Sequence, residues 1–140
     1  MTSTSSHQAE APMTMHEQLP AVVESVPAAR RAVRRFAGSL EVDVVGISLA
    51  VSEAVANVVA HAYPDGDPGV IDLSGTASPD EVAIVVRDRG CGLDGAHASH
   101  GAGFGIEIIR RLAQDVAIHD GEPGVQVTMR FRRGGPWSVG

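Results

Sequence analysis

The stretch AVSEAVANVVAHAY, residues 50–63, predicts the helix around which the rest of the chain can be arranged. Glu53, Asn57 and His61 recur every four residues, so they share one face of that helix. Valines occupy the opposite face, and the helix is expected over about residues 43–62. A carboxylate and an amide one turn apart can act as a general base and as a ligand of a hard cation. The alternative is an ordinary solvent-exposed polar stripe.

The segment VVRDRGCGLD, residues 85–94, places an acidic residue where a strand should end. Asp88 follows a continuous apolar run, and Gly90 and Gly92 come shortly after it. A carboxylate at the end of a strand can accept a hydrogen bond from an adenine amino group, and glycines let the backbone approach a flat ring closely. A tight turn, in which Asp and Gly are common, is the alternative.

The segment GAGFGIEIIRRL, residues 101–112, is rich in glycine at its start. Gly101, Gly103 and Gly105 lead from a long loop into a helix that is expected over about residues 103–114. Exposed N–H groups at a helix N-terminus form a natural phosphate site. The pattern is not GxGxxG and does not follow a strand directly, which argues against a Rossmann fold. The alternative is a flexible loop with a chance excess of glycine.

The remaining periodicity predicts an α+β two-layer sandwich, in which three helices cover one face of a mixed, mostly antiparallel sheet. Residues 1–16 are polar and aperiodic and are expected to form a disordered tail, and residues 134–140 a frayed end. A single domain, residues 17–133, lies between them. Strands are expected at residues 17–23, 70–74, 82–88, 116–119 and 125–131.

Another helix is expected to follow the first strand, with Ser25 as its N-cap and Pro27 in its first turn. Its apolar stripe lies opposite a face of four arginines. A basic face of this kind is either a solvated surface or a docking surface for an acidic partner. The arginines are Arg30, Arg31, Arg34 and Arg35.

The composition restricts the functions that are open to the chain. Its 140 residues suit one domain, and the single cysteine, Cys91, favours a reduced, cytoplasmic setting. The formal net charge of −6 disfavours nucleic-acid binding through bulk charge. No secretory signal or membrane-spanning run is expected. All 11 Lys and Arg residues are arginines, which excludes a P-loop because that motif needs a lysine.

The three segments together occur in a specific order: ExxxN on a helix, DxGxG after a strand, and GxGxG at the start of a helix. This order resembles the Bergerat nucleotide-binding fold, which includes DNA gyrase and histidine kinases, over about residues 17–132. Within it, LAVSEAVANVVAHAY, VVRDRGCGLD and GFGIEIIRRLAQDVAI are most similar to the boxes of the stand-alone anti-sigma-factor serine/threonine kinases. A bare ATPase fragment or a histidine-kinase relic is a third alternative, and the relic would need a helix with an acceptor histidine.

The resemblance implies that ATP and Mg²⁺ are bound, and it gives each residue a role. Glu53 would be the catalytic base, Asn57 a Mg²⁺ ligand, and Asp88 the anchor of adenine. His61 would lie beside the phosphates, and a core or surface histidine is the alternative. Two glycines, Gly90 and Gly92, would shape the adenine pocket. Three more would form the end of an ATP lid and contact the phosphates, namely Gly101, Gly103 and Gly105.

One box departs from the family pattern. The last box of the family reads Gly-Thr, whereas here Gly124 is followed by Val125. Thr128 should point to the opposite face of its strand and is therefore no substitute for the missing hydroxyl. We expect ATP to bind weakly for this reason.

The resemblance also implies protein partners. These are a sigma factor, an anti-sigma-factor antagonist that receives the phosphate, and a second copy of the chain that pairs through the first strand. Neither nucleic acid nor a membrane is expected to be a direct partner. The alternative on the same fold is a regulator that acts only through protein contacts, with ATP bound or lost, and the missing threonine favours it.

Overall fold

The computed structural model describes residues 13–63, 69–90, 99–120 and 124–134. The order of helices and strands in this part of the chain is the predicted one. The elements are β1 (Met13–Pro20), α2 (Ser25–Ala37), α3 (Val44–His61), β2 (Val70–Ala77), β3 (Glu81–Asp88), α5 (Ser99–Leu112), β4 (Asp115–Asp120) and β5 (Val125–Arg132).

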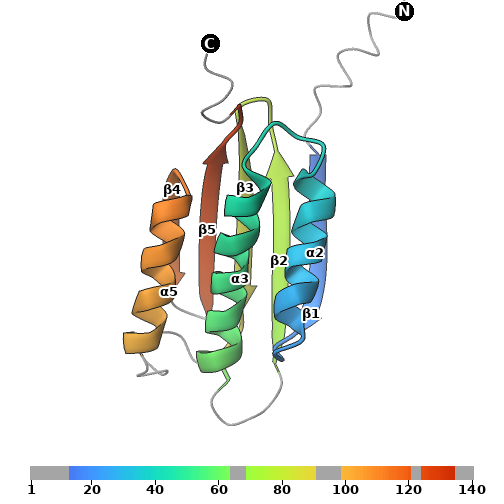
Figure 1. The fold of residues 1–140 in the computed structure, drawn as a ribbon. Coiled ribbons are helices and arrows are strands. Elements are labelled where there is room, and N and C mark those ends of the chain that lie inside the picture. Colours follow the sequence, from blue (N-terminus) through green and yellow to red (C-terminus); the bar gives the residue numbers. More distant parts are fainter. Residues whose placement is uncertain (1–12, 64–68, 91–98, 121–123, 135–140) are drawn as a thin grey trace, which may run out of the picture.

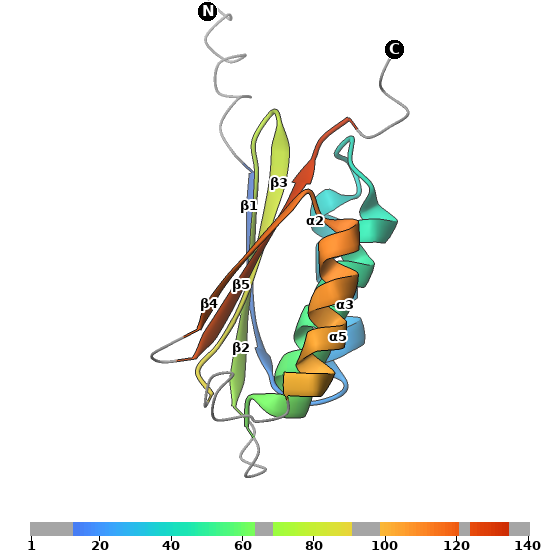
Figure 2. The same cartoon turned by 90° about the vertical axis from the view of Figure 1, so that its left-hand side faces the viewer.

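The strands form a five-stranded sheet in the order β1-β2-β3-β5-β4. Every neighbouring pair is antiparallel, including the pairs that β5 makes with β3 and with β4. The helices α2, α3 and α5 lie side by side on one face of this sheet (Figure 1). The turned view shows that no described helix covers the other face (Figure 2). The predicted α+β two-layer sandwich is therefore confirmed.

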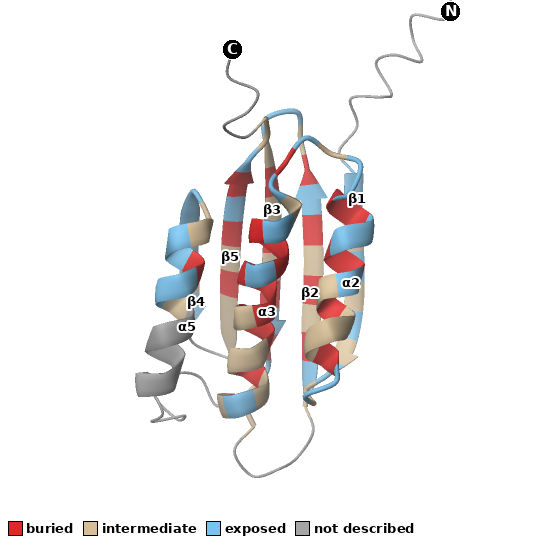
Figure 3. Ribbon diagram, viewed as in Figure 1, coloured by how far each residue is buried: buried red, intermediate tan, exposed pale blue. Residues whose placement is uncertain are grey.

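The core lies between the sheet and the helices because apolar residues alternate along the strands and recur at helical spacing along the helices. This alternation is visible along β2 (Figure 3), and β3 has the same kind of pattern. α3 lies over the middle of the sheet, and its Ile47, Val51 and Val55 are 0% exposed. By length and composition α3 could span a membrane, but 50% of it is buried inside the domain, as in the core helix of a soluble protein.

The first strand begins earlier than the sequence predicts. It starts at Met13, so residues 13–16 belong to the sheet, although residues 1–16 were expected to form a tail. The strand pairs with β2 along its whole length, and this backbone pairing does not depend on apolar side chains. It ends at Pro20 rather than at residue 23.

The start of α2 is also different from the prediction. Ser25 is the first helical residue, Glu24 occupies the N-cap position, and no side chain caps the helix. The Ser25 hydroxyl instead donates to the carbonyl oxygen of Pro20 at 2.5 Å, which closes the turn after β1. α3 does have a side-chain cap, since Asp43 Oδ1 accepts from the backbone N–H of Gly46 at 3.0 Å.

Helix α5 begins at Ser99, before the expected start at residue 103. Gly101 therefore lies within the helix and not in the loop that precedes it. The low helix propensity of glycine favours a later start, but α5 packs beside α3 and fully buries Ile109, and this packing outweighs propensity.

Candidate functional site

Asp88 is the last residue of β3 and points to the face of the sheet that the helices cover. It is 3% exposed, which is rare for aspartate. One carboxylate oxygen, Oδ1, accepts from the backbone N–H groups of Gly90 at 2.8 Å and Val125 at 3.2 Å. No described residue donates to the other oxygen, Oδ2. Among the described residues, Oδ2 therefore keeps its capacity to accept a hydrogen bond.

Two glycines allow three backbone segments to meet at Asp88. A Cβ atom at Gly90 would lie 2.0 Å from the carbonyl oxygen of Ala62, at the end of α3. A Cβ atom at Gly124, just before β5, would lie 2.5 Å from the backbone oxygen of Asp88 and 2.5 Å from its Oδ1. No side chain tolerates such distances, so this close approach requires glycine at both positions.

Helix α3 presents the predicted polar stripe. Glu53, Asn57 and His61 are half-buried, and the core-forming face of the helix lies on its other side. His61 is the last helical residue, so the stripe ends beside Ala62 and the turn that contains Asp88. With a rise of about 1.5 Å per residue, Asn57 lies about 8 Å and Glu53 about 14 Å along the helix from that end. The polar groups are thus spread along a line that leads away from the carboxylate.

The glycine-rich segment is described only in part. Gly92 lies outside the described residues, so its predicted role in the pocket stays a prediction. Gly101, Gly103 and Gly105 lie in the first half of α5, the helix that neighbours α3. Their contact with phosphate also stays a prediction.

The described residues of this site offer few ligands for a divalent metal ion. Within the four described ranges, no group of three or more His, Cys, Asp or Glu residues is placed to hold a metal ion. Asn57 offers an amide oxygen one turn from Glu53, and such an oxygen suits Mg²⁺ without being sufficient for it. The donor set fits a metal ion that is bound together with phosphate oxygens.

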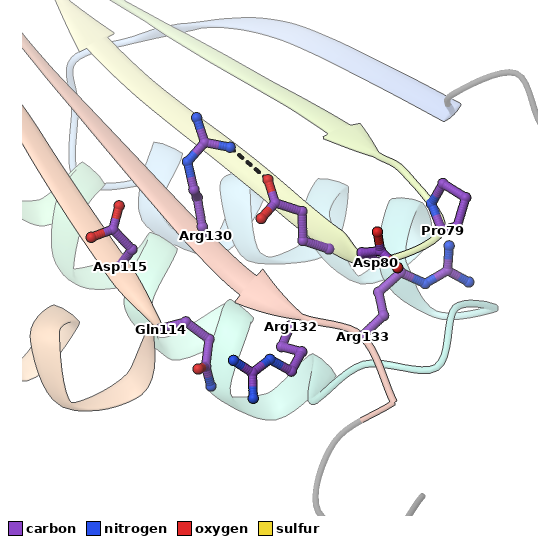
Figure 4. A pocket seen from close by; sticks show the side chains of 8 residues that line it. Pro79, Asp80, Gln114, Asp115, Arg130, Arg132 and Arg133 are labelled. Atoms are coloured by element: carbon purple, nitrogen blue, oxygen red, sulfur yellow. Dashed lines mark hydrogen bonds and ion pairs between the residues drawn. The ribbon is translucent and has the colours of Figure 1, made fainter.

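The opposite end of the sheet contains a different group of charged residues. A hollow of about 450 Å³ lies at the start of β3 and the end of β5 (Figure 4). Arg130 Nη1 donates to Glu81 Oε2 at 2.5 Å, and Arg133 Nη1 donates to the Ser78 carbonyl oxygen at 2.7 Å. Three arginines and three acidic residues line this hollow, so their charges balance one another.

Three residues that were not predicted as site residues shape the Asp88 end, although the sequence singled out two of them, Gly124 and Val125, for a missing hydroxyl. Val125 lacks the expected hydroxyl but supplies a backbone N–H, while Gly124 permits the close approach. The Tyr63 hydroxyl accepts from the Arg89 N–H and donates to the Val70 carbonyl oxygen. Thr128 pairs with Val85 in β3 and lies on the open face, as its spacing predicts. In the sequence, the Gly124-Val125 pair of the last box was the signal that pointed to this end of the sheet.

Comparison with known proteins agrees with this geometry. Residues 19–131 match the family described as the histidine kinase-like ATPase domain. The chain is 32% identical over 131 residues to the serine-protein kinase RsbW of Staphylococcus epidermidis, covering 80% of this chain and 82% of that protein. It is 26% identical over 133 residues to the anti-sigma F factor of Bacillus subtilis, covering 85% and 90%.

Other matches are more partial. The match to the serine-protein kinase RsbW of Oceanobacillus iheyensis has 31% identity and spans 59% of this chain and 61% of that protein. A crystal structure of the RsbU and RsbW domains of a Mycobacterium tuberculosis protein superposes with a TM-score of 0.68 at 23% identity, covering 86% of this chain and 32% of the other. At that identity the likeness concerns the fold alone.

An ATPase-type sandwich with an acidic residue at the end of its central strand and an ExxxN helix defines the class. The chain belongs to the histidine kinase-like ATPase domain family, and within it to the group of RsbW serine-protein kinases and anti-sigma F factors. The resemblance inferred from the three sequence boxes is thereby confirmed.

Proposed function

We propose that this chain is an ATP-binding serine/threonine protein kinase that phosphorylates an anti-sigma-factor antagonist and binds a sigma factor in the cytoplasm. The observation that carries the proposal is the buried Asp88 carboxylate, whose Oδ1 is held by backbone N–H groups and whose Oδ2 has no donor among the described residues. The names of the relatives, serine-protein kinase and anti-sigma F factor, support the choice of reaction and partners.

In this proposal the adenine ring lies at the Asp88 turn. Oδ2 accepts a hydrogen bond from the adenine amino group, and Gly90 and Gly124 let the backbone segments around this carboxylate lie close together. Fixing Oδ1 with two backbone donors keeps the carboxylate oriented before the nucleotide arrives. The phosphates then extend along the polar stripe of α3.

Phosphate transfer uses the far part of that stripe. Glu53 accepts the proton of a serine or threonine hydroxyl on the antagonist while that oxygen bonds to the γ-phosphorus, and ADP leaves. Asn57 would hold Mg²⁺ together with the phosphates, and the ion supplies neutralising charge there. Glu53 lies one turn beyond Asn57 from the adenine end, which is the order that this reaction requires.

The arginine face of α2 is proposed as the docking surface for an acidic segment of a partner protein. Arg31, Arg34 and Arg35 are exposed, whereas Arg30 is half-buried and donates to Ser52 Oγ at 3.2 Å. Clustered exposed guanidinium groups favour carboxylate-rich partners. Replacing the three exposed arginines with glutamine should weaken capture of the partner and leave ATP binding unchanged. Unchanged capture would show that the face is only solvated.

We also expect a homodimer, because β1 is an edge strand of the sheet and no described strand pairs with its outer side. Light scattering over a range of protein concentrations measures the mass directly. A monomer mass at the highest concentration would contradict the dimer.

The alternative is a regulator on the same fold that transfers no phosphate. Val125 favours it, since the hydroxyl of the family's usual threonine is missing, although the Val125 N–H still bonds to Asp88. The two functions differ in one measurement, which is transfer of labelled phosphate from ATP to an antagonist recovered by pull-down. Transfer supports the kinase, and ATP-independent capture of a partner without transfer supports the regulator.

Binding itself is tested by calorimetry with ATP in Mg²⁺ and in EDTA. Because no described acidic cluster holds a metal ion alone, we expect ATP and Mg²⁺ to bind together and the affinity to fall in EDTA. Equal affinity in both buffers would remove Mg²⁺ and Asn57 from the site.

A further inference from the structure

The hydroxyl of Tyr63 connects the two strands that end beside the candidate site. It accepts a hydrogen bond from the backbone N–H of Arg89 at 2.9 Å and donates one to the carbonyl oxygen of Val70 at 2.9 Å. Arg89 directly follows Asp88 in the chain, and Val70 is the first residue of β2. One side-chain oxygen thus contacts both backbones immediately beyond the buried carboxylate.

This hydroxyl occupies the place of the next rung in the β2–β3 ladder. The described pairing ends with Ile71 opposite Asp88, and continuing it would place Val70 opposite Arg89. Gly69 directs its carbonyl oxygen to β1, because it accepts from Ala21 at 2.8 Å. Backbone groups alternate in direction along an antiparallel strand, so the Val70 carbonyl points toward β3.

A direct hydrogen bond from the Arg89 N–H to the Val70 carbonyl would therefore be the regular continuation of the sheet. The Tyr63 hydroxyl stands between these two groups and satisfies both of them. Two hydrogen bonds of 2.9 Å replace one, so the strands are held further apart at this position than a ladder would hold them. The described β2–β3 pairing ends at Asp88, the last residue of β3.

The aromatic ring of Tyr63 is fixed by its own close contact. A Cβ atom at Gly69 would lie 1.9 Å from Cζ of the ring, so the ring rests on backbone that carries no side chain. The neighbouring Ala62 meets Gly90 in the same way. The end of α3 thus packs against the residues next to β2 and β3, and this packing fixes the position of the Tyr63 hydroxyl.

We infer that Tyr63 is a positioning residue that sets the direction of the Asp88 carboxylate by keeping the ends of β2 and β3 apart. This inference rests on the proposed function, in which Asp88 binds adenine. The turn of Asp88, Arg89 and Gly90 is held at each residue by a separate contact, and Tyr63 provides the middle one. Without the hydroxyl, β3 can pair directly with Val70 and rotate the carboxylate away from the ligand.

The test compares Tyr63→Phe with Ser78→Ala. Ser78 Oγ accepts from the backbone N–H of Glu81 at 3.3 Å, so it is a hydroxyl contact at the opposite end of the same two strands. Tyr63→Phe removes both hydrogen bonds of the hydroxyl, and a direct bond between Arg89 and Val70 can replace one of them. A net loss of one hydrogen bond changes an equilibrium constant by about five-fold, so we expect the ATP dissociation constant of the variant to rise by about that factor. Ser78→Ala should leave it unchanged.

A positioning role also predicts which kinetic constant changes. Tyr63→Phe should raise KM for ATP and leave kcat at saturating ATP unchanged, because the hydroxyl touches neither phosphate nor substrate in this arrangement. A variant with the wild-type dissociation constant would overturn the inference. So would a variant that loses kcat while it retains affinity.

Hydrogen exchange separates this inference from the proposed function. The Arg89 amide should exchange differently in Tyr63→Phe than in the wild type, while Ser78→Ala leaves it unaltered. A wild-type chain that binds no ATP would contradict the proposed function, and altered Arg89 exchange in Tyr63→Phe would still show that the Tyr63 hydroxyl holds this amide. Unchanged Arg89 exchange in Tyr63→Phe overturns the spacing role whether or not ATP binds.

Discussion

Strand β3 carries an acidic residue at each end, and the two carboxylates are held in different ways. The side chain of Glu81, at its start, is 40% exposed and pairs with that of Arg130, which is 46% exposed. Asp88, at its end, is 3% exposed, and its described partners are backbone N–H groups. An exposed ion pair contributes little to stability, whereas burying a carboxylate without a cation has a cost that only backbone donors or a ligand offset. Glu81 therefore belongs to the surface, whereas Asp88 is proposed to bind a ligand.

The largest expected effect is on the rate of phosphate transfer, and it comes from a third carboxylate, Glu53, which is proposed to act in the reaction itself. Glu53→Ala should retain ATP binding and lower phosphate transfer by about 10²- to 10⁴-fold, the usual loss when a general base is removed. Glu81→Ala is the matched control and should transfer at the wild-type rate. Nucleotide affinity by calorimetry and labelled phosphate transfer are measured on the same samples. Wild-type transfer by Glu53→Ala would remove Glu53 from the mechanism.

The next effect compares the two ends of β3 directly. Asp88→Asn should raise the ATP dissociation constant more than tenfold, about 1.4 kcal/mol or more, because an amide can present a donor where adenine needs an acceptor. Glu81→Gln removes the exposed charge and should not change ATP affinity. Near-wild-type affinity for Asp88→Asn would mean that Asp88 only shapes its turn.

A smaller effect is expected from the backbone around Asp88. Gly124→Ala places a Cβ atom 2.5 Å from Asp88 Oδ1, so β5 must shift away from β3 at this end. We expect a loss of about 1 kcal/mol in the free energy of unfolding, the lower part of the range for overpacked sites, since Gly124 is only half-buried. Urea unfolding measures this loss, and ATP affinity should fall with it. An unaltered unfolding curve would contradict the close packing.

The smallest effect belongs to the exposed ion pair. Arg130→Ala should lower the free energy of unfolding by less than about 1 kcal/mol, and added salt should reduce the difference further. ATP affinity should stay unchanged. A loss as large as that of Gly124→Ala would show that the two ends of the sheet are less different than their exposure indicates.

The sequence predicted those parts of the fold in which side-chain periodicity matches burial. The four-residue spacing from Glu53 to His61 fixed the stripe of α3, and the apolar run before Asp88 identified β3. The start of β1 at Met13 was not predicted, because it depends on backbone pairing with a distant strand. The early start of α5 at Ser99 depends on packing that overrides glycine propensity.

The same distinction applies to the site. The placement of Asp88 at a strand end and of Gly90 in the following turn could be predicted, since a strand end and a turn are local features of the sequence. Tyr63 was missed because its hydrogen bond to Arg89 spans 26 residues, and nothing local indicates that pairing. The Val125 N–H was missed because sequence reasoning considers its side chain, whereas the contact uses its backbone.

The position of β5 has a consequence for how the protein is made. β5 is the last described strand to be synthesised, yet it lies between β3 and β4. During translation β4 therefore has no strand to join, and Asp88 lacks the Val125 N–H, until the end of the domain leaves the ribosome. At about 5–20 residues per second, the nascent chain passes through a stage in which the edge of β3 is unpaired and open to chaperones. Nucleotide binding thus becomes available only when the domain is almost fully synthesised.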